Sequence, residues 1–499
     1  GDITHPWRSR SSRPQPITKS KIMKSRIEQP TALTATLALC ITLLSPPAFS
    51  SPLTPDQRAR LAAVIAVYQE RAEPPAISVY VDQGGKELYR ADVGMGDVDD
   101  RLAVGPESIY AIGSITKSFT AHAVLNLIGA GRLRLDDTVG SVLTDYQGPA
   151  REVTVRELLD HTSGIPNYVN EIPGLQPRLR RGELQRPEMV ASFSSLPLSF
   201  TPGSRWSYTN SGYYLLGLII ERVSGKSYYD YLRDEVLKPL GITQVWSGDD
   251  REILPNRVRG YDMGAHGVEH ATPWYYLVPY SAGSLLSTAE ELAHYRRAVF
   301  TSPAMPPSVR KLITTEVPLS SGEHTGYLLG AMVRTDFAGL TKYAHSGEIW
   351  GFSSSNAYYP ERDTTIVVLT NRKGPLLTPV SLEREIARIV LGLPAPPVAA
   401  GPLSAGTLRR YSGEYALGPM RIGPPTLSFV ASDGQLYFGF GAVSDPKQML
   451  ALLPAGRDRF VLADDPETAF NFSGIDSQGP AKRVVMDALN GNIPALRTP

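Results

Sequence analysis

A serine and a lysine stand three residues apart in the stretch "YAIGSITKSFTAHAVLNLI", which runs from Tyr110 to Ile128. The stretch has the pattern of a half-buried helix, and positions i and i+3 share one helix face, so we expect the Ser114 hydroxyl to meet the Lys117 amine. Serine is a useful nucleophile only beside a base. Burial makes lysine such a base because it lowers the pKa of the amine. N–H groups at the start of the helix would also favour negative charge near Ser114. The pair therefore indicates acyl transfer, although an exposed helix face would explain the same S-x-x-K pattern.

Two later segments carry side chains that would complete such a site. "WSYTNSGYYLLG" places Tyr208 two residues before Asn210, and "YAHSGEIWGF" places His345, Ser346 and Gly347 on an expected strand. A tyrosine beside a lysine would move a proton to a leaving group, and an asparagine amide would hold a substrate carbonyl. Glycine on the strand would let a substrate backbone approach like an added strand. Taken singly, Tyr208 could be a core tyrosine and His345 an ordinary strand residue.

The order S-x-x-K, Y-x-N and H-x-G resembles the serine β-lactamase and penicillin-binding hydrolase superfamily. The nearer branch holds class C β-lactamases, D-alanyl-D-alanine carboxypeptidases, D-aminopeptidases and β-lactamase-like esterases. "LLDHTSGIPNY" and "SAGSLLSTAEELAHY" are similar to stretches of the same branch, and the resemblance covers about Leu53 to Leu393. It implies a secreted serine hydrolase that acts through an acyl-enzyme on D-amino-acid peptides or small esters.

The resemblance also implies a role for each matching residue. Ser114 would be the acylated nucleophile, Lys117 its base, and Tyr208 the partner of Lys117 in delivering a proton to the leaving group. The remaining residues would contact the substrate: Asn210 orients the acyl side chain, His345, Ser346 and Gly347 line the neighbouring strand, and the backbone N–H groups of Ser114 and Glu348 form the oxyanion hole.

One departure from the β-lactamase pattern concerns His345. β-Lactamases usually carry lysine at this position, where it holds the substrate carboxylate, whereas neutral histidine removes that anchor. Arg334 on the preceding strand would compensate, or it is a plain solvated arginine. We therefore expect weak or no cephalosporin hydrolysis.

Three other functions remain as alternatives to a peptidase or esterase. The protein could be a class C β-lactamase, or a non-catalytic penicillin-binding sensor or scaffold. A third alternative places the function in the C-terminal segment, as a ligand-binding module.

The elements that must position these residues predict an α/β fold. Strand patterns occur early, at Ala76 to Val81 and Glu87 to Val93, and late, at Leu328 to Val333, Phe352 to Tyr359 and Thr365 to Thr370. Helices and loops occupy about residues 140–280 between them. We predict one antiparallel sheet built from both ends of a domain at 51–393, flanked by helices and carrying a mostly helical insertion.

A second, smaller domain is expected at the C-terminal end. The proline- and alanine-rich stretch 394–404 has the composition of a linker. Beyond it, residues 405–499 show short strand patterns separated by turns, with Asp433-Gly434 as a hairpin signal and no convincing helix. This pattern predicts a small β-barrel.

The N-terminal fifty residues predict processing signals. Residues 1–22 are basic and irregular, typical of a leader or upstream sequence, and residues 23–50 have the anatomy of a secretory signal peptide. This predicts a periplasmic or secreted protein with no stable membrane span after cleavage. The single cysteine, Cys40, lies in the apolar part of the signal, so the mature chain would have no disulfide and no cysteine ligand.

Several other chemistries are disfavoured. A net charge of +1 gives no reason to expect a nucleic-acid partner, and the α/β-hydrolase signal G-x-S-x-G is absent. His266 and His270 have helical i, i+4 spacing but no third ligand, so we predict no metal and no cofactor. His161 reads as a structural loop histidine. "WYYLVPY" (Trp274 to Tyr280) would either wall an acyl pocket or simply pack. No oligomeric state is predicted, and the expected partner is a small molecule or short peptide.

Overall fold

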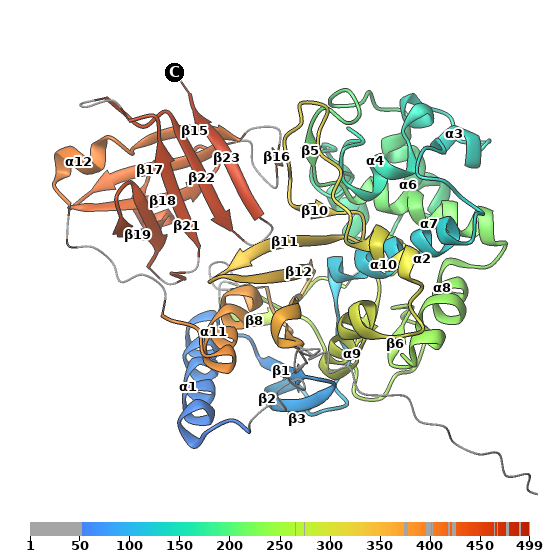
Figure 1. Cartoon of the computed structure of the whole chain (residues 1–499), viewed down its shortest axis with the longest axis horizontal. Coiled ribbons are helices and arrows are strands. Elements are labelled where there is room, and N and C mark those ends of the chain that lie inside the picture. The colour runs from blue at the N-terminus through green and yellow to red at the C-terminus, as the bar shows by residue number, and fades with distance from the viewer. Residues whose placement is uncertain are drawn as a thin grey trace, which may run out of the picture. The chain divides into compact units, whose positions relative to one another are not determined.

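The computed structural model describes residues 52–264, 266–273, 275–373, 378–395, 401, 403–417, 420–421, 426–463, 465–466, 468–475, 479–488 and 491–498 (Figure 1). The expected leader, signal peptide and Cys40 lie outside these residues, as do Trp274 and part of the expected linker. No helix among the described residues has the length and apolar character needed to cross a membrane.

An eight-stranded antiparallel sheet forms the centre of the larger region, which precedes the expected linker. Its order is β10-β11-β12-β13-β14-β1-β2-β3, so strands from the two ends of the region meet where β1 pairs with β14. In Figure 1 the early strands are blue and the late ones yellow to orange. The strands are β1 (Ala76–Gln83), β2 (Lys86–Asp97), β3 (Leu102–Ala103), β10 (Tyr327–Leu328), β11 (Met332–Phe337), β12 (Leu340–Ile349), β13 (Phe352–Tyr359) and β14 (Thr364–Thr370). The predicted sheet is confirmed.

Side chains of β1 alternate between two separate cores because a strand has a period of two. Ile77, Val79 and Val81 pack with the helices α1 (Pro55–Ala72) and α11 (Pro379–Leu391) on one face. Tyr80 belongs to the larger core on the other face. The sheet is therefore covered on both faces, and the helix that follows Ser114 belongs to the larger core.

One expected strand is split in the structure. The stretch Leu328 to Val333 was predicted as a single strand, but β10 ends at Leu328 and β11 begins at Met332. Between them the chain turns, with the N–H of Ala331 donating to the carbonyl of Leu328 at 3.0 Å and Ala331 at a φ of 52°. Because the turn itself is buried, its residues continue the apolar pattern of the two strands. The sequence pattern therefore does not indicate the break between them.

Helices fill the middle of this region, as expected, and short strands that were not expected lie among them. The helices are α2 (Thr116–Gly129), α3 (Val139–Val142), α4 (Val155–Leu159), α5 (Leu175–Arg180), α6 (Arg186–Ser194), α7 (Asn210–Ser224), α8 (Tyr228–Tyr231), α9 (Ala289–Thr301) and α10 (Pro307–Ile313). The short strands are β4 (Tyr110–Ala111), β5 (Trp206–Ser207), β6 (Val245–Trp246), β7 (Tyr261–Gly264), β8 (Gly267–His270) and β9 (Leu286–Ser287). The hairpin β7-β8 holds His266 and His270, so their i, i+4 spacing does not place them on one helix face.

Residues after the linker form a closed barrel of eight strands, in agreement with the prediction. Its core is strongly aromatic, with Tyr415, Phe429 and Phe470 buried among their neighbours. One short helix, α12 (Ala405–Arg409), precedes it, where no helix was expected. The barrel strands are β15 (Gly413–Leu417), β17 (Thr426–Ser432), β18 (Gln435–Phe440), β19 (Leu450–Gly456), β20 (Arg459–Leu462), β21 (Ala469–Ser473), β22 (Arg483–Ala488) and β23 (Gly491–Arg497), while β16 (Met420–Arg421) lies outside the barrel.

Candidate active site

Ser114 and Lys117 meet at the start of α2, as the spacing predicts. Ser114 sits in a 3₁₀ turn, Gly113–Ile115, that runs directly into the helix. The Lys117 amine lies 3.0 Å from the Ser114 hydroxyl oxygen, and the lysine side chain is fully buried. Because the Lys117 side chain has no exposed surface, its amine does not contact bulk water.

Two carbonyl oxygens fix the orientation of that amine. Lys117 Nζ donates to Asn210 Oδ1 at 2.8 Å and to the backbone carbonyl of Ala282 at 2.7 Å. Burial holds the pKa of Lys117 well below its ordinary value, which favours the neutral amine. A neutral amine has two N–H groups and one lone pair. Because both carbonyl oxygens only accept, they take the two N–H groups, and the lone pair is left facing the Ser114 hydroxyl.

Tyr208 completes the group from a segment more than ninety residues away. It lies between β5 and α7, makes a hydrogen bond with the Ser114 side chain, and places its ring 4.8 Å from the Lys117 amine. Desolvation raises the pKa of Tyr208 above its ordinary value, so the phenol keeps its proton. Of these two groups, Lys117 is therefore the one in the basic form.

Asn210 is held in place by Asn167, which the sequence reasoning did not single out. Asn167 Oδ1 accepts from the Asn210 backbone N–H at 3.3 Å and from its side-chain amide at 3.2 Å. Those donations turn Asn210 Oδ1 toward Lys117. Asn167 lies within "LLDHTSGIPNY", and Ala282 within "SAGSLLSTAEELAHY", so the signal was present in stretches that carried no assigned role.

Two glycines let the backbone at Ser114 approach the backbone at Glu348. Gly113 has a φ of 51°, and a Cβ there would lie 2.8 Å from backbone atoms of Glu348. A Cβ on Gly347 would lie 2.0 Å from the carbonyl oxygen of Ile112. The absence of a Cβ at Gly347 therefore allows two protein segments to approach each other. The sequence pattern instead predicts that this glycine allows a substrate backbone to approach. The close approach sets Ser114 and Glu348 beside the same cavity.

His345 points into the protein. Its side chain is 3% exposed, its Nδ1 lies 2.6 Å from the Ser346 carbonyl oxygen, and its Nε2 lies 3.1 Å from the Tyr327 hydroxyl. Burial lowers the pKa of His345 to about 3. Both ring nitrogens have internal partners, so this geometry does not support the expected contact of the side chain with substrate. Ser346 is half-buried, and neither residue lines the cavity at Ser114.

A cavity of about 380 Å³ opens at Ser114, within the usual size of small-molecule sites. Charged side chains of both signs line it, namely Arg180, Asp262, Glu348 and Lys373, with Glu348 and Lys373 paired at 2.7 Å. Val278 and Pro279 of "WYYLVPY" also contribute to its wall. Arg334, expected as a carboxylate anchor, is exposed on β11 and does not line the cavity.

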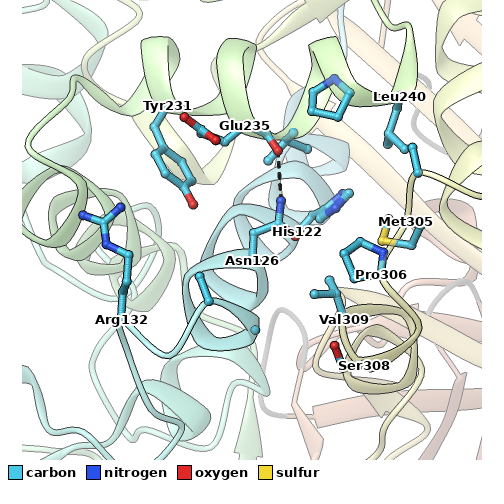
Figure 2. A pocket seen from close by; sticks show the side chains of 15 residues that line it. His122, Asn126, Arg132, Tyr231, Glu235, Leu240, Met305, Pro306, Ser308 and Val309 are labelled. Carbon is cyan, nitrogen blue, oxygen red and sulfur yellow. Dashed lines mark hydrogen bonds between the residues drawn. The ribbon is translucent and has the colours of Figure 1, made fainter.

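A separate cavity of about 430 Å³ lies farther along α2 (Figure 2). His122 and Asn126 reach it from α2, and Asn126 donates to the backbone carbonyl of Glu235 at 3.1 Å. It shares no lining residue with the cavity at Ser114. No cluster of three or more histidine, cysteine or acidic residues suited to a metal occurs among the described residues.

The family model described as Beta-lactamase matches residues 61–391, which hold Ser114, Lys117, Tyr208 and the whole sheet. The chain belongs to the beta-lactamase family. This confirms the resemblance drawn from the three ordered motifs.

Relatives of this beta-lactamase family chain include curated proteins and solved structures. Protein flp of Staphylococcus aureus strain MRSA252 is 27% identical over 325 residues, 64% of each chain, so the match spans under two thirds of that relative's length. Penicillin-binding protein 4* of Bacillus subtilis strain 168 is 25% identical over 332 residues, covering 64% of this chain and 72% of that one.

Two solved structures extend the comparison. A D-stereospecific amidohydrolase from Streptomyces sp. is 26% identical with a TM-score of 0.58, covering 68% of this chain and 100% of that one. An octameric penicillin-binding protein homologue from Pyrococcus abyssi is 24% identical with a TM-score of 0.59, covering 88% and 99%. The latter likeness concerns the fold alone, and it extends beyond the part matched by the family model.

Proposed function

We propose that the protein is a secreted serine hydrolase that forms an acyl-enzyme on Ser114. One observation carries the proposal: a fully buried Lys117 amine lies 3.0 Å from the Ser114 hydroxyl, with its two N–H groups directed at carbonyl oxygens. Membership of a family of hydrolases supports it, and so does the cavity that opens at Ser114.

Acylation proceeds through a series of proton transfers between the side chains and the substrate. The Lys117 lone pair takes the Ser114 proton as the serine oxygen attacks the substrate carbonyl. The backbone N–H groups of Ser114 and Glu348 stabilise the resulting oxyanion. The Lys117 proton then passes through the Tyr208 hydroxyl to the leaving amine or alcohol, and the carbonyl re-forms as an ester on Ser114. Water next replaces the leaving group, and the same proton path runs in reverse to release the acid.

The substrates are amides or esters of small acyl groups, with D-amino-acid peptides first. Similarity to a D-stereospecific amidohydrolase supports this choice, and so do charges of both signs in the cavity, because a peptide end carries an ammonium or a carboxylate. Asp262 would hold an ammonium, and Arg180 or Lys373 a carboxylate. The absence of a lysine at the His345 position supports weak turnover of carboxylated β-lactams.

A fluorophosphonate probe, which reacts with an activated serine, tests the proposal at Ser114. The wild-type protein should be labelled on Ser114, located by mass spectrometry, while the Ser114→Ala variant should stay unlabelled with an unchanged circular dichroism spectrum. A panel of p-nitrophenyl esters, nitrocefin, D-alanine p-nitroanilide and diacetyl-Lys-D-Ala-D-Ala then ranks the substrates. Failure of the wild type to label at high probe concentration and long times would favour a non-catalytic scaffold.

A further inference from the structure

A buried chain of hydrogen bonds links the Tyr208 segment to the strand that carries Glu348. It begins at the backbone N–H of Thr209, which lies 3.2 Å from His161 Nδ1. His161 Nε2 lies 3.2 Å from the Tyr327 hydroxyl, and that hydroxyl lies 3.1 Å from His345 Nε2. His345 Nδ1 ends the chain at the Ser346 carbonyl. All three side chains are at most 3% exposed.

The polarity of this chain follows from its two ends. A backbone N–H only donates, so His161 Nδ1 accepts and the proton of this neutral ring lies on Nε2. A carbonyl oxygen only accepts, so His345 Nδ1 carries the proton and its Nε2 accepts. Burial lowers the pKa of both histidines, which keeps each ring neutral. The Tyr327 hydroxyl therefore accepts from His161 and donates to His345.

A neighbouring hydroxyl does not disturb that assignment. Tyr213 also contacts the Tyr327 hydroxyl, but its own proton goes to the backbone carbonyl of Leu159 at 2.8 Å. Were Tyr327 to donate to Tyr213 instead, His345 Nε2 would be left as a buried acceptor without a donor. Such a group costs about 1–3 kcal/mol, so the donation to His345 is favoured.

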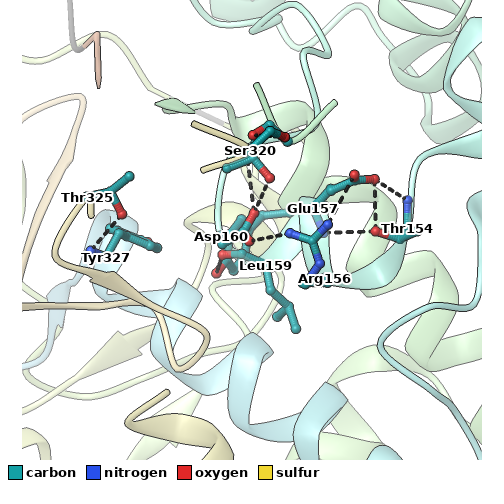
Figure 3. A network of polar contacts seen from close by, with 11 residues as sticks. Thr154, Arg156, Glu157, Leu159, Asp160, Ser320, Thr325 and Tyr327 are labelled. Carbon is teal, nitrogen blue, oxygen red and sulfur yellow. Dashed lines mark hydrogen bonds and ion pairs between the residues drawn. The ribbon is translucent and has the colours of Figure 1, made fainter. Parts of the chain in front are cut away.

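The backbone and the ring of His161 are both held in place by neighbouring groups. Its backbone has a φ of 61°, an uncommon conformation for a residue other than glycine. Its ring lies 4.3 Å from the ring of Tyr208, centre to centre. Just before it, the buried Asp160 accepts from Arg156 and from the backbone and hydroxyl of Thr162, a network that ties down the end of α4 (Figure 3). The surroundings therefore hold His161 in a strained place, which is common at functional sites.

We propose that His161, Tyr327 and His345 form a positioning chain of fixed polarity, which holds Tyr208 and the Glu348 strand in register around Ser114. This rests on the proposed acyl-enzyme function. It assigns His161 and His345 to geometry, since neither ring has a nitrogen left for a substrate. Loss of the middle hydroxyl would leave two buried ring nitrogens without partners and loosen both segments together.

The Tyr327→Phe variant tests the chain, because it removes the hydroxyl and keeps the ring. We expect the rate constant for acylation by the fluorophosphonate probe to fall about 10- to 100-fold, since small misplacements of reacting groups cost that much. The matched control is Tyr359→Phe. Tyr359 is equally buried, and its hydroxyl donates to Glu383 in the core on the opposite face of the sheet. That variant should lose comparable thermal stability while acylation stays within about twofold of wild type.

Nitrogen-15 NMR of histidine-labelled protein gives a readout that does not depend on activity. We expect the Nε2–H tautomer for His161 and the Nδ1–H tautomer for His345, and a change at both rings in Tyr327→Phe. The opposite tautomers in wild type, or acylation of Tyr327→Phe at the wild-type rate, would overturn the chain. Failure of the proposed function looks different, because the wild type itself would then not be labelled while the tautomers would still be as assigned.

Discussion

At the scale of single residues, the proposed mechanism depends on the charge state of Lys117. The amine is the nearest base to the hydroxyl, and burial favours its neutral form. Tyr208, by contrast, keeps its proton because desolvation raises its pKa. The two shifts have opposite chemical consequences, since a lowered lysine pKa creates a base at working pH and a raised tyrosine pKa preserves a proton donor.

The acylation rate should accordingly rise with pH in a single titration step, as the Lys117 amine loses its proton. Below the lowered pKa of Lys117 the amine is protonated and has no lone pair for Ser114, so the rate falls as the pH falls. Lys117→Ala should reduce the acylation rate constant by about 10²-fold or more, as expected for loss of a general base. Stopped-flow labelling between pH 5 and 10 measures both effects, with a circular dichroism check of the fold. Near wild-type acylation by Lys117→Ala would assign the base elsewhere.

At the scale of elements, the proposed oxyanion hole depends on how closely a 3₁₀ turn and a strand approach each other. Gly113 precedes Ser114, Gly347 precedes Glu348, and each glycine faces backbone of the other segment. Neither contact involves a flexible side-chain end that could move aside cheaply. The proposed chemistry at Ser114 therefore requires glycine at both positions, because any other residue would add a Cβ that clashes with backbone.

Gly347→Ala should damage both activity and stability. Its Cβ would lie 2.0 Å from the Ile112 carbonyl oxygen, so the strand or the turn must shift. We expect at least about 100-fold slower acylation and about 1–3 kcal/mol of lost stability from overpacking. Gly105→Ala is the control, since a Cβ there meets nothing within 4 Å. Probe labelling and urea unfolding of both variants test this, and an active Gly347→Ala protein would contradict the packing argument.

At the scale of the whole molecule, the hydrolase region and the barrel have separate cores. The cores on the two faces of the sheet stabilise the hydrolase region, and the barrel has an aromatic core of its own. The residues that assemble around Ser114 come from α2, the Tyr208 segment, the Ala282 turn and β12. This placement favours the hydrolase region over the barrel as the seat of catalysis.

Acid should destabilise the folded protein through its buried histidines. Burial lowers the pKa of His122 and His345 to about 3, against about 6.5 in an unfolded chain. Between these values the unfolded chain binds protons that the folded protein does not. The free energy of unfolding therefore falls as pH falls from about 6.5 toward 3, by up to about 1.4 kcal/mol per pH unit and histidine.

Urea unfolding of wild type and His122→Gln at several pH values measures how much His122 contributes to the pH dependence of the free energy of unfolding. The variant should show the shallower dependence on pH across that window. His294 provides a contrast, because Glu291 raises its pKa and its contribution is lost as pH rises. Equal slopes for wild type and His122→Gln would mean that His122 is protonated in the folded protein.

The sequence by itself determined what is local or periodic. The three-residue spacing brought Ser114 to Lys117 because one helical turn does so in any fold. Alternating apolar residues predicted the paired strands and the barrel, since each strand must bury one face or both. The split between β10 and β11 was missed because a buried turn continues the same apolar pattern.

Only the tertiary structure decided which distant groups would share the site. Asn210 and Ala282 direct the lysine because α7 and the Ala282 turn pack against α2, and no spacing along the chain encodes that contact. His345 turned inward because Tyr327 offers a donor there, which a motif of three letters does not reveal. Long-range packing decides such contacts, whereas short-range periodicity decides the elements themselves.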